Sequence, residues 1–360
     1  MLRRSRSASV ALAALVAVLV LSWIFRGEIT EKLIVRVIER SAALPDPAVG
    51  LPDGLHVGLC GTGSPMTDSR HSGPCTAVLA GNRLFIVDAG PGSASVLNRM
   101  LLNPGRIDAV LLTHFHGDHI GGLGDLALQR WISASAKTPL EVYGPAGAVA
   151  VVEGIKRAYS SDNDYRTAHH GSLIAPPEGR GLSAREFSTG TDGRAVLIDT
   201  PPLKITAFLV DHGPVQPAVG YRFDYKGRRI VISGDTRAST AVEREAQNVD
   251  LLIHEGLSPR LVALMERGFA RHARTAYAQV MADIRNYHTS PEQAAEIAQR
   301  AGVKMLVFNH IVPPLPSRFL DARFLGDATS RFDGPIRVGV DGDWFFLGVG
   351  STDVEMSSRP

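Results

Sequence analysis

The sequence has no excess of positive charge outside its first 26 residues. Four of its 38 lysines and arginines stand in residues 1–26, which contain no acidic residue, so the other 34 are outnumbered by 36 aspartates and glutamates, a net charge of −2. Proteins that hold nucleic acid usually present a basic surface to the phosphates. We therefore expect no nucleic-acid partner.

Cysteine is almost absent, and the common nucleotide-binding motifs are missing. Only Cys60 and Cys75 occur, both near the starts of expected strands, which favours two buried free thiols over a disulfide formed in an oxidising compartment. The stretch GTGS (61–64) has neither the G-x-G-x-x-G pattern nor the lysine of a phosphate-binding loop. These absences, with a hydrophobic content of 44%, indicate an ordinary folded domain.

A long apolar run follows a basic start. Residues 7–25 carry no charge, and arginines stand at positions 3, 4 and 6 before them. The run is about as long as a bilayer-spanning helix, and no small-residue cleavage site follows it. The pattern predicts a transmembrane anchor over residues 1–26, and a cleaved signal is the alternative. The positive-inside rule then places the protein at the inner membrane, with its catalytic domain in the periplasm or outside the cell, or secreted if the signal is cleaved.

The segment after the anchor predicts a stalk and a linker. Apolar residues at helical spacing over 27–44 indicate an amphipathic helix, whose partner is the domain itself, the membrane surface or a second copy in a homo-oligomer. Proline and glycine over 44–54 indicate a linker. The expected division is anchor or signal 1–26, stalk and linker 27–54, folded domain 55–350 and tail 351–360.

Strand-like runs alternate with helical segments from Leu55 onward, which predicts a layered α/β domain with two mixed sheets. Residues 291–301 read as a helix, with Ser290 as N-cap, Gln293 in the capping-box position and Gly302 as the stop. Residues 148–200 are less regular, and we expect them to form an insertion over the active face.

Three histidines and an aspartate follow one apolar run directly. The stretch LLTHFHGDHIGG (111–122) places His114, His116, Asp118 and His119 at the carboxyl end of an expected strand, where α/β enzymes commonly hold ligands. In an extended loop His114 and His116 point the same way, so these two can share one metal ion and Asp118 and His119 another. The donor set suits zinc, and also manganese or iron.

Three further candidate ligands stand at the ends of other expected strands: His212 in FLVDHGP, Asp235 in VISGDT and His310 in LVFNH. A carboxylate such as that of Asp235 can bridge two divalent ions about 3.5–4 Å apart, the separation used in two-metal hydrolysis. The pattern therefore predicts a dinuclear metal site.

These residues resemble the metallo-β-lactamase superfamily across residues 55–347. The motifs GTGSP, DAGPG, GYR, SGDT, HEG and HTSPEQA are similar to the ribonuclease Z branch and its exported, arylsulfatase-like relatives. The resemblance implies a four-layer αβ/βα sandwich, preceded here by the transmembrane helix, with two zinc ions between its halves. It assigns His114, His116 and His212 to the first ion, Asp118, His119 and His310 to the second, and Asp235 to both.

The resemblance also implies the chemistry. A hydroxide held between the ions is the expected nucleophile. Catalysis is assigned to Asp118, Asp235 and His288. His288 would protonate the leaving group or stabilise developing charge, and a helix-start surface histidine is the alternative. Asp88 and His254 are expected to orient ligands through hydrogen bonds.

Residues Asp164–Gly171 contain Arg166, His169 and His170, which either line the substrate mouth and bind an anionic group or form only local loop structure. The basic, glycine- and proline-rich arm of tRNA-processing relatives has no counterpart. The expected function is therefore zinc-dependent hydrolysis of a small-molecule ester outside the cytoplasm, either a sulfate ester or a phosphodiester. A β-lactam or lactone hydrolase and a catalytically silent, membrane-tethered metal-binding protein are the alternatives.

Overall fold

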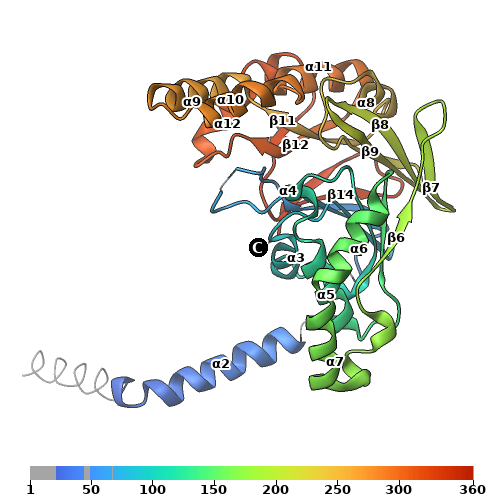
Figure 1. Ribbon diagram of the computed structural model, residues 1–360, viewed down its shortest axis with the longest axis vertical. Helices are drawn as coiled ribbons and strands as arrows, with labels where there is room; N and C mark the ends of the chain where they lie inside the picture. The colour runs from blue at the N-terminus through green and yellow to red at the C-terminus, as the bar shows by residue number, and fades with distance from the viewer. Residues whose placement is uncertain (1–21, 44–48, 67, 360) are drawn as a thin grey trace, which may run out of the picture. The chain divides into compact units, whose positions relative to one another are not determined.

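The computed structural model describes residues 22–43, 49–66 and 68–359 (Figure 1). The chain divides into two compact units, Met1–Val49 and Gly50–Pro360. The first contains α2 (Arg26–Ala43), a helix where the apolar spacing predicts one, with its stripe exposed, as at Ile38 (60%). No helix among the described residues is long and apolar enough to cross a membrane. The predicted transmembrane helix is not shown, because most of residues 7–25 lies outside the described residues.

The first sheet of the second unit has eight strands. Its order is β15-β14-β1-β2-β3-β4-β5-β6, antiparallel from β15 to β3 and parallel from β3 to β6. The strands are β1 (Gly54–Gly61), β2 (Cys75–Ala80), β3 (Arg83–Val87), β4 (Ile107–Leu111), β5 (Leu140–Gly144), β6 (Leu182–Glu186), β14 (Asp343–Gly348) and β15 (Glu355–Ser358).

The second sheet has seven strands in the order β13-β12-β11-β10-β9-β8-β7, with the segment from β10 to β13 parallel and the rest antiparallel. The strands are β7 (Arg194–Thr200), β8 (Leu203–His212), β9 (Val215–Tyr225), β10 (Arg228–Ile232), β11 (Leu251–Leu257), β12 (Met305–Val312) and β13 (Ile336–Val338).

Helices cover the outer face of each sheet (Figure 1). The first sheet carries α3 (Ser93–Arg99), α5 (Leu123–Ala134) and α6 (Ala148–Ala158), and the second carries α8 (Thr240–Glu245), α11 (Pro291–Ala301) and α12 (Asp321–Leu325). The remaining helices are α4 (Gly117–Ile120), α7 (Ser160–Ile174), α9 (Pro259–Arg271) and α10 (Thr275–Asp283), with short 3₁₀ turns at 104–106, 177–179, 284–286, 318–320 and 328–330. Two sheets between helical layers confirm the predicted α/β sandwich.

Two apolar layers hold this arrangement together. Between the sheets, Phe85 of β3 packs near Phe223 of β9, with ring centroids 6.1 Å apart, in a cluster drawn from both sheets. A second cluster joins the outer face of the second sheet to α8, α11 and α12. Because β1, β11 and β12 are buried along their whole length, their apolar residues do not alternate with exposed polar ones.

The predicted helix signals at 290–302 are confirmed. The Ser290 hydroxyl accepts from the backbone N–H of Gln293, the Gln293 side chain accepts from the backbone of Ser290, and Gly302 ends α11 at φ 64°. This local chemistry fixes both ends of α11.

Cys60 and Cys75 form a disulfide, so the expectation of two free thiols is wrong. The strands β1 and β2 are antiparallel neighbours whose register shifts between Leu59 and Gly61, which brings the Cα atoms of the two cysteines to 4.9 Å. The sequence spacing of 15 residues does not reveal this shift.

Candidate metal centre

Four of the candidate ligands come from the loop and short helix that follow β4. Leu111 ends β4, His114 and His116 lie in the loop, and Asp118 and His119 lie in α4. His114 and His119 are buried, at 0% and 1% exposure. The parallel neighbours β3 and β4 end at the same edge of the sheet, so this edge carries the first half of the site.

The other three candidates come from the second sheet. His212 is the last residue of β8, Asp235 follows β10, and His310 lies in β12. The register of β12 against β11 skips His310, whose φ of 45° marks a bulge that turns its side chain into the site. Gly234 has φ 61°, and a Cβ there would lie 2.6 Å from the carbonyl oxygen of Val219, so glycine is required just before Asp235.

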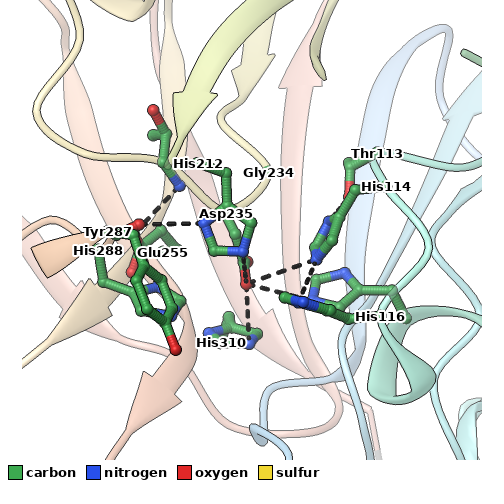
Figure 2. A network of polar contacts seen from close by, with 12 residues as sticks. Thr113, His114, His116, His212, Gly234, Asp235, Glu255, Tyr287, His288 and His310 are labelled. Carbon is green, nitrogen blue, oxygen red and sulfur yellow. Dashed lines mark hydrogen bonds and ion pairs between the residues drawn. The ribbon is translucent and has the colours of Figure 1, made fainter. Parts of the chain in front are cut away.

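The two halves meet at Asp235, which Figure 2 shows between the imidazoles. Its Oδ2 lies 3.9 Å from His114 Nε2, 3.4 Å from His119 Nε2, 3.8 Å from His212 Nε2 and 3.3 Å from His310 Nε2. Three groups of donor atoms, each within 4.8 Å of one another, can hold a cation: His114, His116, His212 and Asp235; Asp118, His119 and His310; and Asp235, His288 and His310.

The hydrogen bonding of these side chains fits metal ions. His119 Nδ1 donates to Asp88 Oδ2 at 2.8 Å and His212 Nδ1 donates to the carbonyl of Tyr287 at 3.0 Å, while the Nε2 atoms of both are buried without a hydrogen-bond partner in the described chain. Metal-binding histidines are typically held in this way, with one ring nitrogen fixed and the other left for the ion. The free Oδ1 of Asp235 adds an anionic donor to the same space.

Electrostatics favour the donor forms of His114, His212 and Asp235. For His119, burial would lower the pKa, but the carboxylates of Asp235 and Asp88 raise it well above its ordinary value. Burial holds the pKa of His114 well below its ordinary value and lowers that of His212, so both imidazoles keep a free lone pair at neutral pH. For Asp235, burial alone would raise the pKa, but the neighbouring His310 and His119 hold it well below its usual range. Neutral imidazoles around an ionised carboxylate suit a divalent cation.

Asp88, expected to orient a ligand, lies directly behind the loop. Its Oδ1 accepts from the backbone N–H of Thr113, and its Oδ2 accepts from the Thr113 hydroxyl and from His119 Nδ1, all at 2.8 Å. Asp88 has φ 59°, a left-handed conformation that aspartate tolerates. The contacts match the expected role, which stays a prediction.

His288 and Glu255 form a hydrogen-bonded pair beside the candidate metal ligands (Figure 2). His288 Nδ1 donates to Glu255 Oε1 at 3.2 Å, and the same oxygen accepts from the backbone of Thr289 at 2.8 Å. Burial opposes the charged imidazole, but Glu255 raises the pKa of His288 to about 9. Sequence reasoning missed Glu255, although the motif HEG contains it; it singled out His254, which is buried and bonds only to the neighbouring carbonyl of Glu255.

A cavity of about 750 Å³ opens beside the centre. His288 and His310 form part of its wall together with Ser64, Asp68 and Arg70, and the rest is mostly apolar: Met66, Met265, Phe269, Val280, Met281 and Ile284. Its size lies in the range of ligand-binding pockets. The segment 259–284 therefore supplies much of the wall of the cavity. No lining residue of the cavity comes from residues 148–200.

The structure does not bring Arg166, His169 and His170 to the centre. All three lie in α7, where Arg166 Nε donates to Asp162 at 2.8 Å and the two histidines are exposed. Among the described residues, none of the three lines the cavity or joins a group of candidate metal ligands.

The chain resembles known proteins over most of its length. A family model described as the Beta-lactamase superfamily domain matches residues 83–311. A protein named Ribonuclease Z from Mycolicibacterium gilvum (strain PYR-GCK) is 38% identical over 290 residues, which are 80% of this chain and 94% of that protein.

Two solved structures share the fold. A metallo-β-lactamase fold protein, YhfI from Bacillus subtilis, aligns with a TM-score of 0.58 at 20% identity, over 82% of this chain and 100% of its own. The short form of human tRNase Z aligns with a TM-score of 0.56 at 21% identity, over 85% of this chain and 99% of its own. The relatives bear out the ribonuclease Z part of the resemblance and give no support to the arylsulfatase-like part.

These relatives correct the expected partner. A small-molecule ester as substrate and the absence of nucleic acid were inferred from a net charge of −2, from the missing basic arm and from the predicted location outside the cytoplasm. Relatives that are ribonucleases by name, matched over four fifths of the chain, contradict that inference. The net charge of a chain does not report where basic side chains gather on its surface.

The expected location is also wrong. The inner-membrane anchor, with the catalytic domain in the periplasm or outside the cell or secreted, was inferred from the apolar run at 7–25. The ribonuclease relatives contradict it.

Proposed function

The chain belongs to the β-lactamase superfamily, in its ribonuclease Z-like branch, and we propose that it is a two-zinc phosphodiesterase that hydrolyses RNA. The observation that carries the proposal is the buried Asp235 carboxylate, which lies within 3.9 Å of imidazole nitrogens from both sheets. The names of the relatives favour a phosphodiester over the sulfate ester, β-lactam and lactone that the residues alone left open.

Seven side chains would hold the ions. His114, His116 and His212 surround one position, Asp118, His119 and His310 surround the other, and Asp235 lies between them. Two divalent ions bound there would supply a water molecule acidic enough to attack at neutral pH and would neutralise charge on the phosphate. Asp88 would support this set by fixing the ring of His119.

His288 is the proposed proton donor to the leaving oxygen. Its Nδ1 is held by Glu255, so its Nε2 side is available to the cavity whose wall it forms. With a pKa raised to about 9 by Glu255, the imidazole is protonated at neutral pH, the form a general acid requires. Glu255 acts through His288 and is a positioning residue.

Asp235→Asn tests the proposal most directly, because it removes the shared negative charge and keeps the side chain's shape. We expect hydrolysis of a 3′-extended RNA and of bis(p-nitrophenyl) phosphate to fall on the order of 10³-fold, with bound zinc reduced. Initial rates and elemental analysis measure both effects, and a chelator should abolish the wild-type rates. Asp224→Asn is the matched control, since Asp224 pairs with Arg222 on β9, away from the candidate ligands.

Near-normal rates for Asp235→Asn would overturn the assignment of the centre. A β-lactam and a lactone in the same panel should remain intact, and their chelator-sensitive cleavage would favour attack on a carbonyl instead. Full zinc loading without cleavage of any substrate would favour a metal-binding protein without turnover.

A further inference from the structure

Two helices between β11 and His288 form a hairpin beside the cavity. The helices α9 and α10 pack against each other, with the rings of Phe269 and Tyr277 5.3 Å apart. Figure 1 shows the pair projecting together at the side of the second sheet. Both rings line the cavity that reaches His288 and His310, so the hairpin forms one side of an approach to the centre.

The tip of this hairpin concentrates positive charge. Within eight residues stand Arg267, Arg271 and Arg274, all exposed. In the described part of the chain none of the three arginines forms an ion pair with a carboxylate; Arg271 donates only to the backbone carbonyl of Arg267. The domain as a whole is not basic, so this grouping is a local feature of one element.

The acidic residues of the hairpin are engaged elsewhere. Glu266 accepts from Arg285 at 2.5 Å, and Asp283 accepts from the Gln279 amide at 2.7 Å. The Arg274 guanidinium lies 5.9 Å from the centroid of the Tyr277 ring, which joins the basic tip to the aromatic wall. Arginines for phosphates next to aromatic rings for bases are the combination that binds single-stranded nucleic acid.

We propose that the hairpin of α9 and α10 is the RNA-binding element of this protein. Arg267, Arg271 and Arg274 bind backbone phosphates, and Phe269 and Tyr277 stack against a base, which leads the strand into the cavity toward His288. The proposal rests on the proposed function and adds to it the surface that holds the RNA. An apolar ligand would leave the arginines unused, and a free phosphate would leave the aromatic wall unused.

The test replaces the three arginines together, as Arg267→Gln/Arg271→Gln/Arg274→Gln. Binding of a fluorescent RNA hairpin, whose single-stranded 3′ extension has non-hydrolysable linkages, is measured by anisotropy on the zinc-loaded protein. We expect affinity to fall at least tenfold and the slope of log affinity against log salt to become shallower by about 2, as three lost phosphate contacts imply. With cleavable substrates, the loss in kcat/KM on RNA should exceed that on bis(p-nitrophenyl) phosphate at least tenfold.

The matched control removes the same charge from other exposed positions, as Arg99→Gln/Lys137→Gln/Arg157→Gln, and should leave RNA affinity nearly unchanged. Tyr277→Ala examines the aromatic wall separately. Its side chain is 56% exposed, so the fold should tolerate the change, and lost stacking should weaken binding about tenfold with little change in the salt slope.

Equal RNA affinity and salt slope in the triple arginine variant and the wild type would overturn the proposal, and so would equal losses in the control. If the wild type cleaves RNA but the arginine variant cleaves it equally well, only the binding surface is wrong. If the zinc-loaded wild type cleaves neither RNA nor the small diester, the proposed function itself fails.

Discussion

The two ends of the strands β10, β11 and β12 carry buried charge in different ways. At their amino ends, Asp250 accepts from Lys304 Nζ at 2.7 Å, from Arg228 Nε at 3.1 Å and from the backbone N–H of Arg229 at 2.9 Å. Arg228 also donates to three backbone carbonyls of residues 348–353. These charges are satisfied within the chain, so their role is structural.

At the carboxyl ends, the buried polar groups are left incomplete. Asp235 Oδ1, Glu255 Oε2 and His310 Nδ1 have no hydrogen-bond partner among the described residues. Leaving buried polar atoms unpaired costs free energy, about 1–3 kcal/mol each. The comparison teaches that satisfied buried charge marks the part of a sheet that holds the fold, and unsatisfied buried charge marks the part that awaits a ligand.

The largest loss of activity is expected at His288. Because His288 lies near Asp235 and His310, its substitution also tests whether it is a metal ligand itself or only a neighbour of the ligands. We expect His288→Ala to lower kcat on RNA by about 10²–10⁴-fold, the usual contribution of a general acid, with bound zinc unchanged. The loss should be smaller for a diester with an acidic phenol as leaving group, which needs little protonation. Loss of zinc by elemental analysis would instead make His288 a ligand.

A smaller loss of zinc affinity is expected from Asp88, which is as fully hydrogen-bonded as Asp250 but contacts the candidate ligand His119. Asp88→Asn should weaken zinc binding by about 10- to 100-fold, because His119 loses the carboxylate that orients it. Titration against a competing chelator measures the change. Asp108→Asn, on the exposed side of β4, is the control, and equal affinities for both variants would contradict this role.

The smallest effect is expected at Asp250, at the amino ends of β10, β11 and β12, and concerns stability rather than activity. Burial would raise the pKa of Asp250, but the bonds from Lys304 and Arg228 lower it below its ordinary value. The stabilisation is therefore present above the unfolded pKa of about 3.9 and is lost as pH falls through the folded pKa. We expect Asp250→Asn to reduce the free energy of unfolding by roughly 1–3 kcal/mol at pH 7 and by less near pH 3, without loss of zinc. Urea unfolding at both values measures this, and an undiminished difference at pH 3 would contradict it.

That the candidate ligands come together could be predicted because each stands at, near or shortly after the end of an apolar strand. Such ends meet at one edge of a sheet, so positions as distant as His114 and His310 converge without any signal from the residues between them. The α/β class and the caps of α11 were equally visible, because they depend on local periodicity and on single residues such as Ser290 and Gly302.

The features that the sequence did not reveal depend on the register between strands, on contacts between distant segments, or on local charge that the net charge of the chain averages out. The disulfide requires a shift in the pairing of β1 with β2, and the orientation of His310 requires a bulge in β12. Glu255 and His288 are 33 residues apart in the sequence. Their hydrogen bond forms because the fold places β11, which contains Glu255, beside the loop that contains His288. The basic tip of the α9–α10 hairpin does not show in the net charge, because acidic residues elsewhere in the chain balance its arginines.

Two of the groups of candidate ligands take side chains from both halves of the domain, His114 with His212 in one and His119 with His310 in the other. A cation bound in either group would therefore act as a cross-link between the two halves of the sandwich. Metal binding and unfolding would then be linked. A bound ion would add about 2.7 kcal/mol to the free energy of unfolding when the free metal concentration is a hundredfold above its dissociation constant. The availability of metal to the cell would set the lifetime of the folded domain as well as its rate of turnover.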